Sequence, residues 1–162
     1  QLLVAPYTPG EILLGKGTAS VITGIIQAVF VVLVAMFWFR IPFQGSIWLL
    51  SAALLLFIVT AAAIGLCISS FAQSLQQAIV GTFLLLVPMV MLSGFATPIS
   101  SMPEIFQDLT LLNPMRYGLE LIQRIFLEGA SFLDLWPLFA AIMAVTVVAV
   151  LAAVFSFHHK IS

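Results

Sequence analysis

Hydrophobic positions gather into four long stretches of the chain. These stretches carry no ionisable side chain and cover residues 18–39, 47–71, 78–95 and 135–157. A transmembrane helix needs about 20 mostly apolar residues, because a helix rises about 1.5 Å per residue and the hydrocarbon core is about 30 Å thick. The pattern therefore predicts an all-α membrane protein with four transmembrane helices.

Four crossings assign the polar segments to two sides of the membrane. The first side holds residues 1–17, 72–77 and 158–162, and the second side holds residues 40–46 and 96–134. The three tryptophans, Trp38, Trp48 and Trp136, fall at the second side and predict one aromatic belt there. The basic residues do not decide the absolute orientation, because Lys16 and Lys160 on the first side face Arg40, Arg116 and Arg124 on the second.

Short local patterns predict where helices begin and how they pack. Thr8-Pro9-Gly10-Glu11 has the spacing of a capping box with proline at the first helical position, which predicts a helix start near Pro9. Ser20, Gly24 and Ala28 lie at spacing four, as do Ala61, Gly65 and Ser69. Small residues at this spacing allow two membrane helices to approach closely, although they also occur by chance in apolar helices.

Pro88 lies inside the third stretch. A proline removes a backbone hydrogen bond to the carbonyl four residues earlier and kinks a helix. Pro88 is therefore a hinge candidate, and the alternative is that proline is simply frequent in membrane helices.

The segment 96–134 is too polar to span a membrane, and its pattern predicts two short helices. Ser101-Met102-Pro103-Glu104 has capping-box spacing and predicts a first helix to about Leu111. Asn113 and Pro114 predict the N-cap and first position of a second helix, which runs to about Leu127 with Gly129 just beyond its end. The segment is therefore predicted to be a helical hairpin on the second side of the membrane.

Charges of alternating sign recur every four residues along the second predicted helix, at Arg116, Glu120, Arg124 and Glu128. Residues at this spacing share one helix face and can form ion pairs. Such a helix can lie at the membrane interface, or it can dip into the bundle and act there as a gate. The alternative interpretation is that these four charges, which we call the charge ladder, only stabilise a surface helix.

Composition and missing motifs exclude several functions. Only 7% of the residues are charged and the net charge is -1, so nucleic acid is not an expected partner. The chain has no Walker A loop, no catalytic residues and no metal site, because its two histidines stand together in the terminal tail without further ligands. The spans hold no residue that could relay protons, which disfavours a proton-coupled carrier. An enzyme is therefore not expected.

Two sets of residues together resemble the type-2 ABC transporter permeases. The first set resembles the cytoplasmic segment that follows the second span of that family: Gln1-Leu2-Leu3-Val4-Ala5-Pro6 and Glu11-Ile12-Leu13-Leu14-Gly15-Lys16. The second set resembles its extracytoplasmic end: Leu92-Ser93-Gly94-Phe95, Pro98, Met102-Pro103, Leu112-Asn113-Pro114, Tyr117 and Arg124-Ile125-Phe126-Leu127-Glu128-Gly129. The similarity covers nearly the whole chain and is nearest to the bacterial multidrug-export branch.

This resemblance implies a six-span half-transporter of which the chain is the C-terminal part, in keeping with an amino terminus that looks like the cut end of a longer protein. It implies a second permease subunit, identical or different, and a separate ATPase subunit that carries ATP and magnesium, with no cofactor in this chain. Residues 1–17 become a cytoplasmic segment that couples to the ATPase, through Leu2, Leu3, Pro6, Glu11, Gly15 and Lys16. Residues 97–130 become a re-entrant gate hairpin, with Asn113, Pro114, Arg116, Tyr117, Glu120, Arg124, Glu128 and Gly129.

The sequence thus predicts a permease subunit of an ATP-driven exporter in a bacterial inner membrane. Its substrate would be an amphipathic small molecule, such as a drug, or a lipid-like molecule, and the apolar spans do not specify which. The alternatives are a fragment of a secondary carrier and a membrane scaffold subunit without transport.

Overall fold

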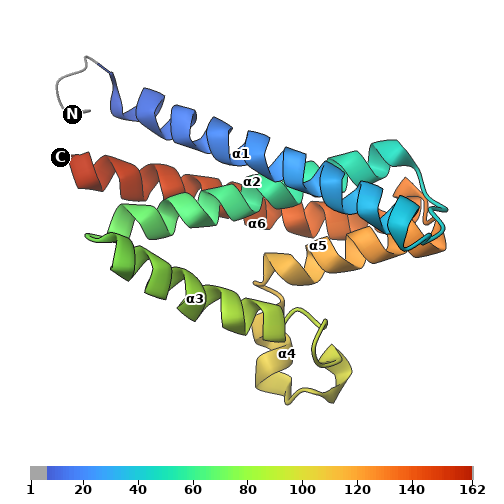
Figure 1. Ribbon diagram of the computed structural model, residues 1–162. Helices are drawn as coiled ribbons and strands as arrows, with labels where there is room; N and C mark the ends of the chain where they lie inside the picture. The colour runs from blue at the N-terminus through green and yellow to red at the C-terminus, as the bar shows by residue number, and fades with distance from the viewer. Residues whose placement is uncertain (1–6, 162) are drawn as a thin grey trace.

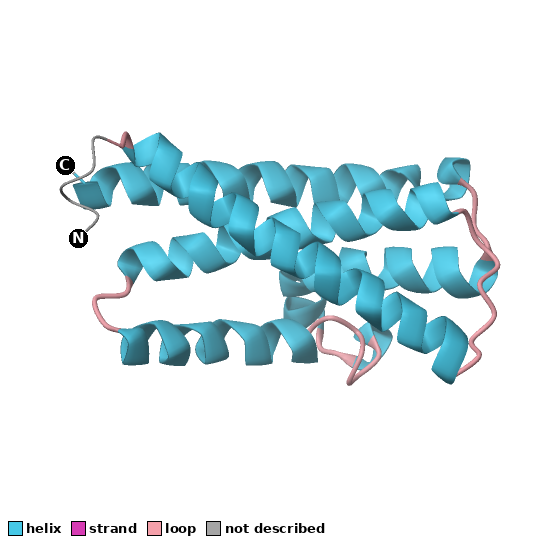
Figure 2. Cartoon of the chain, turned by 45° about the horizontal axis from the view of Figure 1, so that its top comes forward, coloured by secondary structure: helices cyan, strands magenta, loops and turns pink. Residues whose placement is uncertain are grey.

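The computed structural model describes residues 7–161, and Figures 1 and 2 show them as helices joined by short connections. The α-helices are α1 (Pro9–Leu33), α2 (Ile47–Phe71), α3 (Leu75–Met91), α4 (Glu104–Thr110), α5 (Pro114–Gln123) and α6 (Phe132–Ile161). π-Helical turns follow α1 at Val34–Trp38 (η2) and α5 at Arg124–Glu128 (η4), and a 3-10 turn lies at Ile99–Ser101 (η3). No strand occurs in this part of the chain, and the all-α prediction is confirmed.

The long helices run side by side and define two ends of a bundle (Figure 1). We call the end where α1 begins, α2 turns into α3 and α6 finishes the inner end, and the opposite end the outer end. Three helical segments are long and apolar enough to cross a membrane, and these are Pro9–Trp38, Ile47–Phe71 and Phe132–His159. α3 is a shorter apolar helix of 17 residues that begins three residues before the predicted stretch 78–95 and ends four residues before its end.

The helix starts show why the local sequence patterns work. The Thr8 hydroxyl accepts the backbone N–H of Glu11, and the Glu11 carboxylate accepts the backbone N–H of Thr8 at 2.7 Å. This reciprocal pair is the predicted capping box, so the predicted start near Pro9 is confirmed. At the start of α3, the Ser74 hydroxyl accepts the backbone N–H of Gln77 and fixes that helix in the same way.

α2 and α6 form the most extensive helix contact of the described chain. At its centre, the hydroxyls of Thr60 and Thr146 lie 2.5 Å apart and are both buried. A hydroxyl has one proton, so one of the two donates to the other, which in turn donates to a carbonyl one turn earlier in its own helix. Two hydroxyls can therefore pair within an apolar bundle without leaving a polar group unsatisfied.

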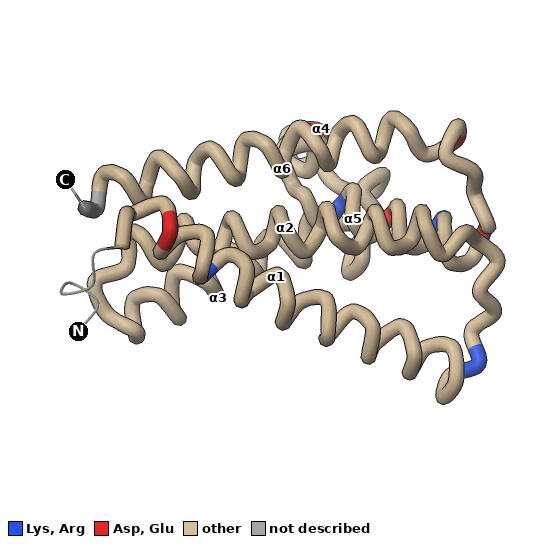
Figure 3. Tube along the Cα trace, turned by 90° about the horizontal axis from the view of Figure 1, so that it is seen from above, with Lys and Arg blue, Asp and Glu red and all other residues tan. Residues whose placement is uncertain are grey.

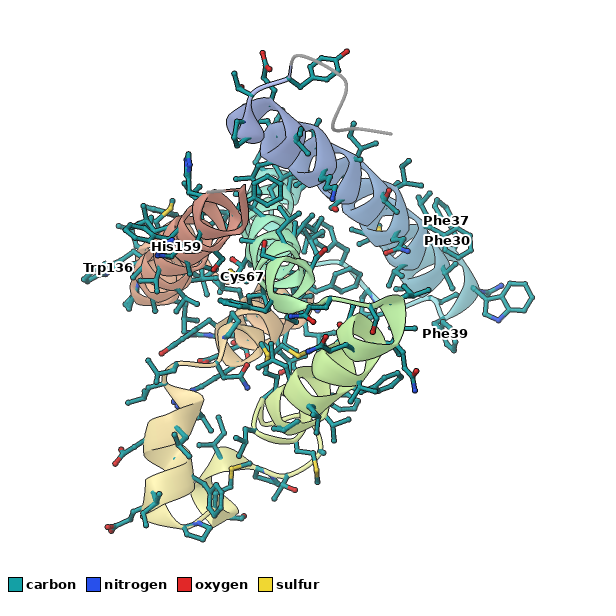
Figure 4. The ribbon with its side chains drawn as sticks, turned by 90° about the vertical axis from the view of Figure 1, so that its left-hand side faces the viewer. Phe30, Phe37, Phe39, Cys67, Trp136 and His159 are labelled. Atoms are coloured by element: carbon teal, nitrogen blue, oxygen red, sulfur yellow. The ribbon has the colours of Figure 1, made fainter. Side chains whose placement is uncertain are left out.

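The buried core lies toward the outer end, where α5 packs against α2 and α6. Its members are apolar side chains from all three helices and η4: Leu50, Ala53, Leu121, Ile125, Phe126, Leu135 and Ile142. α1 and α3 contribute no buried residue within the described chain. Figure 4 shows Phe30, Phe37 and Phe39 extending away from the other helices, and Trp136 extending outward from α6. These exposed aromatic side chains suit a lipid environment.

Only some of the small-residue positions make close helix contacts. A Cβ added at Gly24 would lie 2.6 Å from the Ile58 side chain, so α1 approaches α2 closely at the predicted position. A Cβ at Gly65 would meet nothing within 4 Å. The small-residue pattern in α1 therefore marks a close helix contact, whereas Gly65 makes no such contact with another described residue.

Two glycines allow the outer loop to pack on η4. A Cβ at Gly45 would collide with the backbone carbonyl of Ile125, and the backbone N–H of Gln44 donates to the Phe126 carbonyl at 3.1 Å. Gly129 ends η4 in the left-handed conformation with φ 62°, and a Cβ there would lie 2.7 Å from the Gln44 carbonyl oxygen. The predicted glycine beyond the second hairpin helix is confirmed, and both glycines permit a backbone-to-backbone approach.

We expect Gly45→Ala to lower the free energy of unfolding by about 1–3 kcal/mol, because the new methyl group overpacks the contact between the outer loop and η4. Thermal unfolding of the purified protein in detergent measures the change. Gly10→Ala is the matched control, since a Cβ there meets nothing within 4 Å. Equal melting temperatures for the two variants would contradict the proposed close approach.

Candidate functional site

α5 runs from the middle of the bundle to its outer end. Pro114 and Met115 at its start line a cavity of about 340 Å³ together with Thr60 and Ala61, which lie near the midpoint of α2. After α5, the η4 turn contacts the outer loop at Gly45. Since the 25 residues of α2 extend about 37 Å, the start of α5 lies at the depth of the bilayer centre.

The charged residues of α5 therefore lie at different depths. Figure 3 shows blue and red positions alternating along α5, from the middle of the bundle to its outer end. Arg116 is in the first turn of α5 and is the deepest of the four, whereas Glu128 ends η4 near the outer loop. Charged side chains at the centre of a membrane are costly and are found where they line pathways or pair with other groups.

Asn113 connects α5 to α3 by capping both helices. Its side-chain oxygen accepts the backbone N–H of Met115 at 3.0 Å, which is the predicted N-cap of α5. Its side-chain nitrogen donates to the backbone carbonyl of Met89 at 2.7 Å. The two partners fix the orientation of the amide, because one is a donor and the other an acceptor. The N-cap prediction is confirmed, and the second bond is an addition to it.

The Asn113 bond satisfies a carbonyl at the end of α3. In a continuous helix, the Met89 carbonyl would accept the N–H of Ser93, but that N–H instead bonds to Val90. Gly94 with φ 88° then turns the chain away from the helix. Pro88 lies one residue before the bonded carbonyl, and its ring leaves the Leu84 carbonyl without its regular helical donor. The role of Pro88 as a hinge stays a prediction.

Arg116 and Tyr117 hold the end of α4 against the start of α5. Arg116 Nη1 donates to the hydroxyl of Thr110 at 2.5 Å, and Tyr117 Oη donates to the Leu111 carbonyl at 2.6 Å. The Arg116 guanidinium also lies 6.0 Å from the centre of the Tyr117 ring. Thr110 is fully buried, and Arg116 Nε is buried without a hydrogen-bond partner among the described residues. Arg116 thus supports the helix junction.

The charge ladder is divided into two parts. Arg124 lies between two carboxylates, with Nη1 3.9 Å from Glu120 and Nε 3.5 Å from Glu128. In the part of the chain that the structure describes, no ion pair joins Arg116 to Glu120. The side chains of Glu120 and Arg124 are 44% and 34% exposed. Reversing the charge of Glu120 would therefore not create a buried cluster within this chain, and the gate role of these residues stays a prediction.

The first hairpin helix does not begin as predicted. Ser101 lies in η3, and the residue that caps α4 is Pro103, which makes no side-chain capping bond. Met102 has extended backbone angles, since a residue that precedes proline is disfavoured in the helical region. The predicted capping box at Ser101 is wrong, although a short helix does end close to Leu111.

The predicted coupling residues are described only in part. Leu2, Leu3 and Pro6 lie outside the described residues. Glu11 caps α1, and Gly15 and Lys16 are exposed on its first turns at the inner end. Among the described residues, no group of three His, Cys, Asp or Glu side chains could hold a metal ion.

Sequence reasoning missed three contacts of the site. These are the Asn113 bond to Met89, the Arg116 bond to Thr110, and the approach of Gly45 to Ile125. Each joins residues of two different elements, so spacing within one helix could not reveal it. The one available signal was polarity, because Asn113 and Arg116 had to find partners inside an apolar bundle.

The apolar spans define a multi-pass membrane protein, and comparison with known proteins gives its family. The family model described as "ABC-2 type transporter" matches residues 1–127, which is most of the chain. The chain belongs to the ABC-2 type transporter family. It is a multi-pass inner-membrane protein with helices that cross the bilayer.

Three relatives from Escherichia coli K12 carry permease names. The chain is 32% identical to "Probable multidrug ABC transporter permease YbhR" over 99% of this chain and 44% of that protein. It is 36% identical to "Inner membrane transport permease YhhJ" over 90% of this chain and 39% of that protein. It is 33% identical to "Probable multidrug ABC transporter permease YbhS" over 79% of this chain and 34% of that protein. The chain thus spans less than half the length of these curated relatives. No solved structure is significantly similar to the chain.

We expect Thr110→Val to lower the free energy of unfolding by about 1.5–3 kcal/mol, because it keeps the buried shape and removes the acceptor of a charged donor, Arg116. Arg124→Gln is the comparison on the same helix, and its half-exposed ion pairs should be worth less than about 1 kcal/mol. Chemical denaturation in detergent measures both changes. A larger effect for Arg124→Gln would contradict the division of the ladder.

Proposed function

We propose that the chain is part of a permease subunit of an ATP-driven exporter in a bacterial inner membrane. The substrate is an amphipathic small molecule, such as a drug, or a lipid-like molecule. The complete permease pairs with a second permease subunit, identical or different, and with a separate ATPase subunit that binds ATP and magnesium. Membership of the ABC-2 type transporter family and the names of the relatives support this function.

The observation that carries the proposal is the course of α5. The predicted spans have no ionisable side chain, so they offer no group that could couple transport to protons. α5 adds polar and charged groups from the middle of the bundle to its outer end (Figure 3). An apolar inner half followed by a partly charged outer half suits a molecule that has both apolar and polar parts. In this proposal the energy for export comes from the ATPase subunit.

The inner end supplies the contact with that partner. Residues 9–16 form the first turns of α1, and the Thr8–Glu11 capping box fixes where the helix begins. In this proposal the segment with Leu2, Leu3, Pro6, Glu11, Gly15 and Lys16 rests on the ATPase in the cytoplasm. A rigid helix start transmits a displacement of that segment along α1.

The orientation of the bundle is tested by thiol labelling. Cys67 is first replaced by Ala, and single cysteines are then placed at Ser46 or Ser74, which are exposed at opposite ends of α2. A membrane-impermeant thiol reagent added to intact cells should label Ser46→Cys and spare Ser74→Cys.

Permeabilised cells provide the control, because both cysteines should then react. Labelling of Ser74→Cys alone in intact cells would place the outer end of the bundle in the cytoplasm and contradict the proposed export direction.

The coupling to ATP is tested in the full-length permease reconstituted with its ATPase. Deleting residues 2–5 should leave membrane insertion intact and reduce permease-dependent ATP hydrolysis to the level of the ATPase alone, because the contact is lost. Hydrolysis is measured as phosphate release, and export is measured with ethidium as the probe.

His159→Ala is the matched control, since this residue lies at the same end of the bundle on α6 (Figure 4). It should retain hydrolysis and export. If the deletion variant also hydrolyses ATP at the full rate, residues 1–16 are not the coupling segment.

A further inference from the structure

α3 has few attachments to the rest of the described chain. None of its residues is buried, and its main helix contact is with α2, to which it is joined by the short turn at the inner end. Gly81 lies against Ile68 of α2, where an added Cβ would be 3.5 Å from the Ile68 side chain. Toward the outer end, α3 diverges from α2 and meets the start of α5 (Figure 1). The attachment at that point is therefore a large part of what positions α3.

The attachment is the amide of Asn113. It is the side chain that joins the end of α3 to α5 by a hydrogen bond, through Nδ2 and the Met89 carbonyl at 2.7 Å. Asn113 is only 6% exposed, so water does not compete for either group. A carbonyl without a donor is costly in this environment, and serine or aspartate at position 113 could keep the cap of α5 but would not offer the amide donor.

The two helices joined by Asn113 differ in how firmly they are held. α5 and η4 contribute Leu121, Ile125 and Phe126 to the core, so they are part of the packed bundle with α2 and α6. Within the described residues α3 has no buried side chain, and Pro88 interrupts its hydrogen bonds one residue before the bonded carbonyl. Without the Asn113 bond, the last turn of α3 could pivot at Pro88.

We propose that Asn113 is a positioning residue that anchors the outer end of α3 to α5, so that α3 follows movements of the re-entrant helix during export. This inference rests on the proposed function for its role in transport, whereas the anchor itself does not depend on it. Asn113 acts through the Met89 carbonyl and the N–H of Met115, and it needs no contact with the substrate.

The anchor is tested by the mobility of a spin label on α3. In the full-length permease with Cys67→Ala, a nitroxide is attached to Met91→Cys, at the last residue of α3, which is 54% exposed. Asn113→Ser keeps an oxygen that can cap α5 and removes the amide nitrogen that donates to the Met89 carbonyl. It should release the end of α3 about tenfold more often and increase the mobile component of the electron paramagnetic resonance spectrum.

Tyr117→Phe is the matched control, because it removes one hydrogen bond from the same junction without touching α3. Its spectrum should match that of the unsubstituted protein. Asn113→Asp is a second variant, with a side chain of the same shape. If Asn113→Ser does not fold, the spectrum of Asn113→Asp is compared with that of Tyr117→Phe instead. An unchanged spectrum in a folded Asn113 variant, or the same change in Tyr117→Phe, overturns the anchor.

The role in export is tested with the same variants reconstituted with the ATPase. Asn113→Ser should hydrolyse ATP at a rate close to that of the unsubstituted complex while exporting several-fold less ethidium per ATP. An unchanged ratio of export to hydrolysis overturns the transport role. If the unsubstituted complex neither hydrolyses ATP nor exports ethidium, the proposed function fails, and the spin-label spectra still decide whether Asn113 anchors α3.

Discussion

The structure depends on one constraint, which is that backbone polar groups inside a bilayer must find partners within the protein. A continuous helix meets this constraint everywhere except at its ends. α1, α2 and α6 avoid the problem by ending near the two surfaces, whereas α3 ends and α5 begins at the depth of the bilayer centre. Two of the groups freed there bond to one side chain, because Asn113 donates to the Met89 carbonyl and accepts the N–H of Met115. Side-chain hydroxyls inside the bundle are under the same constraint, and those of Thr60 and Thr146 pair with each other where α2 packs against α6.

Depth also separates the roles of the charges on α5. Arg116 lies deepest, and its contacts are a hydroxyl and an aromatic ring rather than a carboxylate. Arg124 lies farther out and is shared by two carboxylates whose side chains are 44% and 64% exposed. A charge near water gains little from an ion pair, whereas one deep in the bundle depends on each hydrogen bond it can make. The four charges recur evenly in the sequence but have two roles. Arg116 supports the helix junction, whereas Glu120, Arg124 and Glu128 form a half-exposed ion-pair group.

Local patterns in the sequence predicted the features that depend on local geometry. The capping box at Thr8, the N-cap at Asn113 and the glycine beyond η4 each follow from a few adjacent residues. Three of the four predicted spans follow from length and apolarity, whereas the third predicted span corresponds to the shorter helix α3. The box at Ser101 failed for a local reason as well, because Met102 precedes a proline and cannot easily be helical. The contacts between segments were not predictable, since Asn113 and Met89 are 24 residues apart and only the fold brings them together.

The two ends of the α5–η4 segment are held in different ways, and this bears on which element can move. At the outer end, Gly45 and Gly129 bring backbone against backbone, where no side-chain rotation can relieve a displacement. At its start in the middle of the bundle, α5 is linked to α3 by the side-chain amide of Asn113. A backbone contact between closely packed segments resists sliding more than a single hydrogen bond does, because many van der Waals contacts must change together. Displacement is therefore easier at α3 than at η4, so α3 is the element that would move in the proposed export cycle.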